Sequence, residues 1–79
     1  MKYSEHFLRD TLVLRPFLRF EWCEQVIREP ERTEEQDDGR VRHWGYIPEL
    51  GHYLRVVTEA DRETVVTAFP DGRFRGLQS

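Results

Sequence analysis

Three histidines are the side chains of this sequence best suited to move a proton near neutral pH, because the imidazole pKa ordinarily lies there. They are His6, His43 and His52. Each could act as a general acid or base, and the alternative for each is an ordinary surface or packing role. The three do not follow the spacing of a metal site, so the sequence predicts neither a bound metal nor another cofactor.

Arginine provides nearly all of the positive charge, since Lys2 is the single lysine among 12 basic residues. Guanidinium groups make forked contacts with phosphate, and aromatic rings stack on unpaired bases. A sheet face that interleaves the two therefore suits single-stranded RNA. Strand alternation predicts such a face from Arg40, Arg42, Trp44, Tyr46, Tyr53 and Arg55. The alternative is a solvated face on which arginine stems lie over the rings.

Two other features could carry chemistry, and each has a simpler explanation. Cys23, the single cysteine, lies on the apolar side of a predicted helix, which favours core packing over nucleophilic catalysis. An acidic cluster could attract a hard cation, but it lacks the pattern of a calcium loop and is interpreted as an exposed polar arm. Its members are Glu34, Glu35, Asp37 and Asp38.

Composition narrows the class of protein. The chain has 79 residues, 38% of them hydrophobic and 13% aromatic, which predicts a single folded domain over residues 1–79. The net charge of −3 provides no overall attraction to nucleic acid or to a membrane, and a DNA partner is not expected. The sequence has neither a long apolar run nor a secretion signal at its start, so the protein is expected to be cytoplasmic.

Two helices must position the N-terminal candidates. Ser4 can cap a first helix over about Ser4–Leu12, which ends where Arg15-Pro16 disfavours helical backbone. A second helix is predicted over Phe17–Arg28, where apolar side chains recur with helical periodicity, and Pro30 ends it.

The remainder of the chain carries strand patterns. The predicted segments are an exposed edge strand over Glu31–Asp37, then Arg40–Ile47, Tyr53–Glu59 and Arg62–Phe69, followed by a loose tail over Arg73–Ser79. Asp38-Gly39 signals a tight turn after the edge strand. The predicted fold class is α+β, with two N-terminal helices packed on one face of a three- to four-stranded antiparallel sheet.

Alternation also predicts which side chains form the core. From the strands it selects Val41, Ile47, Leu54, Val56, Val65 and Phe69. From the helices it selects Phe7, Leu8, Leu12, Phe20, Cys23, Val26 and Ile27. The same assignment places His43 and Thr67 on the buried side of the sheet.

Several short stretches follow one another in a familiar order. They are YSEHFLRD, an Arg-Pro break, FEWCEQVIREP, DDGRVRHWGYIPE, YLRVVTE and ETVVTAFP, and they span about residues 3–70. This order resembles a family of short domains related to RelE-type ribonuclease toxins, within the barnase–EndoU–colicin–RelE group. The resemblance implies a helical pair beside a curved antiparallel sheet, with RNA on the open face and an antitoxin protein as partner.

The resemblance also implies metal-independent RNA cleavage, in which the 2′-hydroxyl attacks the adjacent phosphate. His6 and Arg9 match a His-x-x-Arg pair on the first helix, Arg40 matches the arginine of DGR, and Thr67 matches a strand threonine. Arginine would then hold the phosphate and stabilise its developing charge, and His6 would transfer the proton. The face argument adds Arg42, Trp44, Tyr46, Tyr53 and Arg55 as RNA-binding residues.

A second hypothesis is a non-catalytic protein-binding or regulatory module that keeps the toxin-like fold. Ribosome-directed toxins are usually strongly basic, whereas this chain carries −3, and its tail has no catalytic tyrosine or histidine. A protein partner would add a strand to the exposed edge over Glu31–Asp38. A third, purely structural hypothesis is a dimerising domain that uses the same edge.

Overall fold

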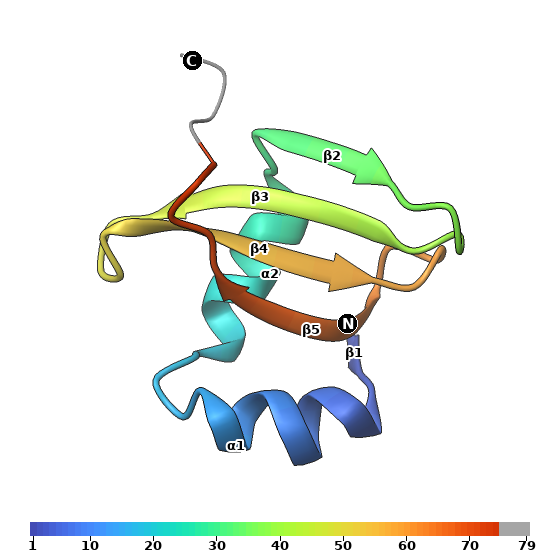
Figure 1. Cartoon of the computed structure of the whole chain (residues 1–79), viewed down its shortest axis with the longest axis horizontal. Helices are drawn as coiled ribbons and strands as arrows, with labels where there is room; N and C mark the ends of the chain where they lie inside the picture. Colours follow the sequence, from blue (N-terminus) through green and yellow to red (C-terminus); the bar gives the residue numbers. More distant parts are fainter. Residues whose placement is uncertain (75–79) are drawn as a thin grey trace.

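A five-stranded mixed sheet, with strand order β1-β5-β4-β3-β2, supports the helices in the computed structural model, which describes residues 1–74 (Figure 1). The strands are β1 Lys2–Tyr3, β2 Arg32–Glu35, β3 Val41–Ile47, β4 His52–Thr58 and β5 Thr64–Pro70. The helical segments are the π-helix η1 Phe7–Thr11, its continuation α1 Leu12–Leu14, and α2 Phe20–Arg28. The predicted α+β class is confirmed. The predicted loose tail over Arg73–Ser79 is wrong for Phe74, which is stacked on Trp44, and its residues 75–79 lie outside the described residues.

The sheet is not purely antiparallel, which corrects the predicted topology. β1 runs parallel to β5, pairing Lys2 with Thr64 and Tyr3 with Val65, whereas all other neighbouring strands are antiparallel. Two residues are too few to show strand periodicity, and their pairing depends on a strand some sixty residues away. The predicted edge strand is present as β2, and Gly39 forms the following turn with φ +92°.

The first helical segment begins as predicted. The Ser4 hydroxyl accepts a hydrogen bond from the Phe7 backbone N–H at 3.1 Å, and helical backbone ends at Leu14, just before Arg15-Pro16. The second helix begins at Phe20 rather than Phe17, because Arg19 has extended backbone with ψ 140°. Within residues 1–74, no helix is long and apolar enough to cross a membrane.

The two helical segments both contribute to the core but pack against different strands. α2 packs against β3 and β4, whereas η1 lies beside β5 (Figure 1). The side of the sheet that contacts α2 is called the helix face below. Leu8 and Phe20, both predicted in the core, are 47% and 41% exposed, so that prediction is wrong for them.

The core lies between α2, η1 and the helix face. Its buried members are Phe7, Leu18, Trp22, Cys23, Val26, Ile47, Leu54, Val56, Val65 and Ala68. Gly45 permits the close approach of α2, because a Cβ atom there would lie 3.1 Å from Val26 Cγ2. Leu12 and Ile27, also predicted in the core, are partly buried against it.

A β-bulge in β5 corrects the predicted faces of that strand. Val57 pairs with Thr67, but the next residue of β4, Thr58, pairs with Val65, so Val66 is an extra residue in β5. The bulge places Val65 and Ala68 in the core and turns Phe69 to the opposite side. Thr67 shares that opposite side, and its predicted position on the buried side is wrong for the same reason.

Candidate functional site

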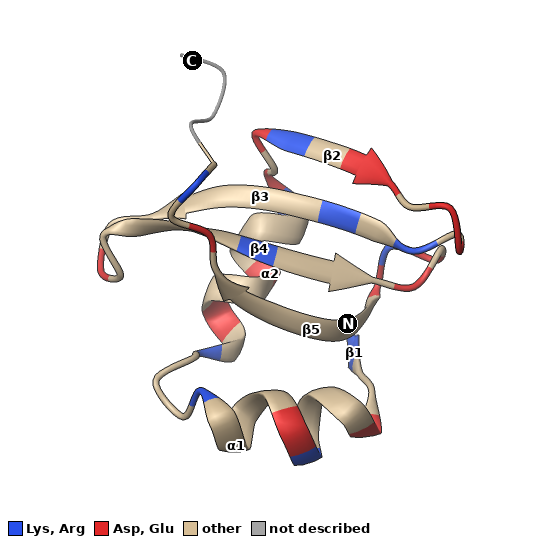
Figure 2. Ribbon diagram, in the orientation of Figure 1, with Lys and Arg blue, Asp and Glu red and all other residues tan. Residues whose placement is uncertain are grey.

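The sheet side opposite the helix face, called the open face below, gathers all five predicted RNA-binding residues. Register places Trp44 opposite Arg55, Arg55 opposite Phe69, and Tyr46 opposite Tyr53. Arg42 belongs to the same side of β3, whereas Arg40 precedes the strand. Figure 2 shows one basic band on β3 and one on β4, and none on β5.

Arginines and aromatic rings alternate across this face. The Arg55 guanidinium lies 4.7 Å from the centroid of the Phe69 ring and 5.4 Å from that of Trp44. Arg15, which follows α1, lies 5.6 Å from the same Phe69 centroid. Each distance is within cation–π range, so the rings hold the guanidinium groups in defined positions.

Asp71, in the turn after β5, is hydrogen-bonded to both Trp44 and Arg55. Its Oδ2 accepts hydrogen bonds from Trp44 Nε1 at 3.0 Å and from Arg55 Nη2 at 2.9 Å and Nε at 3.2 Å. Its Oδ1 accepts the Arg73 backbone N–H at 3.1 Å. Burial alone would raise the pKa of Asp71, but these donors outweigh burial and hold the pKa below its ordinary value.

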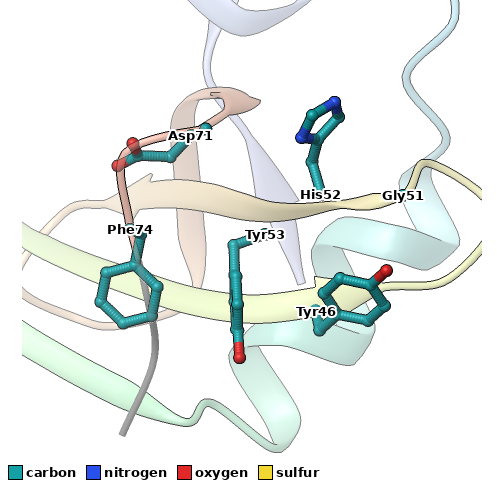
Figure 3. A pocket seen from close by; sticks show the side chains of 7 residues that line it. Tyr46, Gly51, His52, Tyr53, Asp71 and Phe74 are labelled. Atoms are coloured by element: carbon teal, nitrogen blue, oxygen red, sulfur yellow. The ribbon is translucent and has the colours of Figure 1, made fainter. Parts of the chain in front are cut away.

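Three further rings extend the row from Trp44. Phe74 is stacked on Trp44 with centroids 4.9 Å apart and planes 7° from parallel. Tyr53 meets Phe74 edge-on at 4.9 Å, and Tyr46 meets Tyr53 edge-on at 5.3 Å (Figure 3). A hydrogen bond to the Glu31 carboxylate, helped by burial, raises the pKa of Tyr53.

A hollow of about 290 Å³ lies at the outer end of this row. Tyr46, Tyr53, Phe74 and Asp71 contribute to its lining, and His52 is the one histidine there. Figure 3 shows His52 projecting from β4 to the side opposite Tyr53, as strand alternation requires. The lining thus combines aromatic surface with a carboxylate, which suits a ligand that has a flat unsaturated ring.

The four residues that the resemblance assigns to catalysis are dispersed. His6 Nδ1 lies 3.0 Å from Asp10 Oδ2 on the exposed side of the first helical segment, which also carries Arg9. Arg40 Nε donates to Glu59 Oε1 at 3.2 Å. The Thr67 hydroxyl lies 3.0 Å from that of Thr11 in η1. In the described part of the chain, no hydrogen bond or ion pair joins any two of the four.

The acidic cluster predicted as an exposed arm forms ion pairs with Arg40 and Arg42. Arg42 Nη1 donates to Glu34 Oε1 at 2.9 Å, and Asp38 lies 3.9 Å from Arg40. Among residues 1–74, no group of three or more His, Cys, Asp and Glu could hold a metal ion. Cys23 is fully buried, and burial, with the Glu24 charge, raises the pKa of its thiol to about 12.

Sequence reasoning missed four members of the open face, namely Arg15, Phe69, Asp71 and Phe74. The last predicted strand ended at Phe69, just before Pro70-Asp71-Gly72, and the tail from Arg73 was predicted to be loose. An aspartate at that position is also a signal for a turn in which its side chain caps backbone amides, and the structure shows that bond to Arg73. Recognition of that turn would have predicted that residues 71–74 lie close to β5.

His43 is buried on the helix face, 2% exposed, as predicted. Its Nε2 lies 3.0 Å from Thr58 Oγ1, and the Thr58 hydroxyl donates to the Glu59 carbonyl, so Nε2 carries the proton. Nδ1 has no partner in the described structure. Burial, helped by the nearby Arg62 charge, lowers the pKa of His43.

The free energy of unfolding is therefore expected to fall as the pH drops below about 6.5, the ordinary pKa of histidine in an unfolded chain. Below that pH the unfolded chain binds a proton that folded His43 does not, with a limiting slope of about 1.4 kcal/mol per pH unit. Urea unfolding across this pH range should show a smaller slope in His43→Gln than in wild type, and His52→Gln, which replaces an exposed imidazole, is the matched control. An unchanged slope in both variants would assign the acid sensitivity to other groups.

Comparison of the chain with protein families, curated proteins and solved structures finds no match.

Proposed function

We propose that the chain binds single-stranded RNA on its open face, as a RelE-like ribonuclease toxin domain would. The observation that carries this proposal is the alternation of Arg15, Phe69, Arg55 and Trp44, with guanidinium groups 4.7–5.6 Å from ring centroids. Guanidinium groups bind phosphates and rings stack on bases irrespective of sequence, which is the chemistry of single-strand binding. Tyr46, 46% exposed at the outer end of the row, offers a further ring to a base.

Cleavage without a metal ion is the catalytic part of the proposal. An RNA strand that follows the row from Tyr46 to Arg15 would reach the C-terminal end of the first helical segment and continue along it to Arg9 and His6. There the imidazole would transfer the proton of the attacking 2′-hydroxyl, and arginine would stabilise the charge on the phosphate. Thr67, on β5, is hydrogen-bonded to Thr11 of that segment.

Labelled single-stranded RNA incubated with the protein in EDTA tests both parts. Wild type is expected to bind and cleave, and Arg55→Ala to bind at least about tenfold more weakly, since a hydrogen bond to a charged group contributes about 1.5–3 kcal/mol. His6→Ala should bind like wild type and cleave more slowly.

Arg28→Ala is the matched control, because it removes the same charge from the last turn of α2, away from the open face. Thermal melts of every variant show whether the fold is kept. Equal RNA affinity in wild type and folded Arg55→Ala would show that RNA does not bind on the open face.

A protein-binding module is the second candidate, and the open edge of the sheet favours it. Gln36 N–H donates to the Arg40 carbonyl, so alternation directs the backbone groups of Thr33 and Glu35 in β2 away from β3. A strand of a protein partner, with basic side chains facing this acidic edge, could pair there. Absence of both RNA binding and cleavage in the assay above would favour this candidate over the first.

A further inference from the structure

The turn that follows β5 folds back onto the open face and covers the Trp44 indole and the Arg55 guanidinium, the groups suited to bind a base and a phosphate. The Phe74 ring lies flat on Trp44, at 4.9 Å and 7°, and leaves that residue only 5% exposed. The Asp71 carboxylate accepts both Arg55 hydrogen bonds and the Trp44 indole N–H. Trp44 and Arg55 are therefore already occupied by groups of the chain itself.

The Phe74 ring and the Asp71 carboxylate reproduce the chemistry of a nucleotide. A base stacks on an indole with parallel planes a few ångströms apart, and a phosphate accepts forked hydrogen bonds from a guanidinium. Phe74 provides the flat ring and Asp71 the anion, and they contact adjacent groups, since Arg55 and Trp44 are cross-strand partners. The spacing between the ring site and the anion site is therefore set by the sheet.

We propose that residues 71–74 act as an internal substitute for a nucleotide, and that their displacement opens a site for one nucleotide of single-stranded RNA on Trp44 and Arg55. This inference rests on the proposed RNA binding. The base replaces Phe74 on the indole, and the phosphate replaces Asp71 on the guanidinium. The contact in the free chain is autoinhibitory, since RNA must compete with it.

The groups beneath the turn are held in place by contacts that do not involve the turn. Arg55 is held over Phe69 at 4.7 Å and over Trp44 at 5.4 Å, so its guanidinium keeps a defined place when Asp71 leaves. Asp71 N–H donates to the Tyr53 carbonyl at 2.8 Å, and Phe74 N–H reaches the Asp71 carbonyl only at 3.4 Å.

The test measures the affinity of the full chain for a short fluorescein-labelled oligouridine by fluorescence polarisation. Phe74→Ala, which uncovers Trp44, is expected to bind about tenfold more tightly than wild type, because one stacked base contributes about that factor or more. Asp71→Asn, which frees Arg55, is expected to bind more tightly too, with a salt dependence steeper by about 0.7 for the added phosphate contact. Trp44→Ala in the Phe74→Ala background should abolish the gain.

Phe17→Ala is the matched control, since it removes an exposed ring from the helical side and should leave RNA affinity unchanged. Asp71→Asn loses charge-assisted bonds, so each variant is measured at a temperature where circular dichroism shows it folded, and Phe74→Ala alone suffices if Asp71→Asn unfolds. Unchanged or weaker binding by Phe74→Ala, with wild type binding, would overturn this inference and leave the proposed function standing. Failure of wild type and both variants to bind RNA would overturn the proposed function and this inference with it.

Discussion

Leu54→Ala is expected to lower the free energy of unfolding by about 2–5 kcal/mol, the range for deletion of a fully buried leucine side chain. Leu54 is 0% exposed in the middle of the sheet and belongs to the core beneath α2. A chain of 79 residues has a total stability of roughly 4–12 kcal/mol, so the variant should be partly unfolded at moderate temperature. Urea or thermal unfolding followed by circular dichroism measures the loss.

Leu14→Ala provides the same substitution at a site 74% exposed. Its stability should stay within about 0.5 kcal/mol of wild type, because little apolar surface leaves water there on folding. Comparable losses in Leu54→Ala and Leu14→Ala would contradict the assignment of the core to the helix face.

Gly45→Val should also destabilise the fold strongly, by about 1–3 kcal/mol or more, through overpacking. A Cβ atom at position 45 would lie 3.1 Å from Val26 Cγ2 and 3.5 Å from Val26 Cα, so added methyl groups must push α2 off β3. Chemical unfolding of the purified variant gives the change in stability.

The partner substitution Val26→Ala makes this prediction specific. It removes the closest atom, so Gly45→Val with Val26→Ala should lose less stability than the sum of the two single variants. Strict additivity would show that the crowding at Gly45 does not involve Val26.

Regular elements were predictable because their periodicity is local. In β3 and β4 no residue is inserted across the open face, so alternation alone brought Trp44, Tyr46, Tyr53 and Arg55 to one side. The Ser4 cap and the break at Arg15-Pro16 were equally local, and both were placed correctly. These positions follow from side-chain types a few residues apart.

The remaining features depend on distant contacts that periodicity does not contain. The bulge at Val66 reversed the faces of Thr67 and Phe69, because one extra residue changes the parity of everything after it. β1 is fixed only by pairing with β5, and Phe74 by stacking on Trp44. The candidate site was therefore predicted in its β3 and β4 half and missed in its β5 and turn half.

The pairing of β1 with β5 has a consequence for synthesis on the ribosome. Tyr3 can reach its place beside Val65 only after that residue has left the exit tunnel, so the first and last strands join in one late step. Until then, β5 cannot close the core over Phe7, and the nascent chain exposes apolar side chains. Folding of this domain should accordingly be completed after translation of its last strand, and interrupted translation should yield products sensitive to proteolysis.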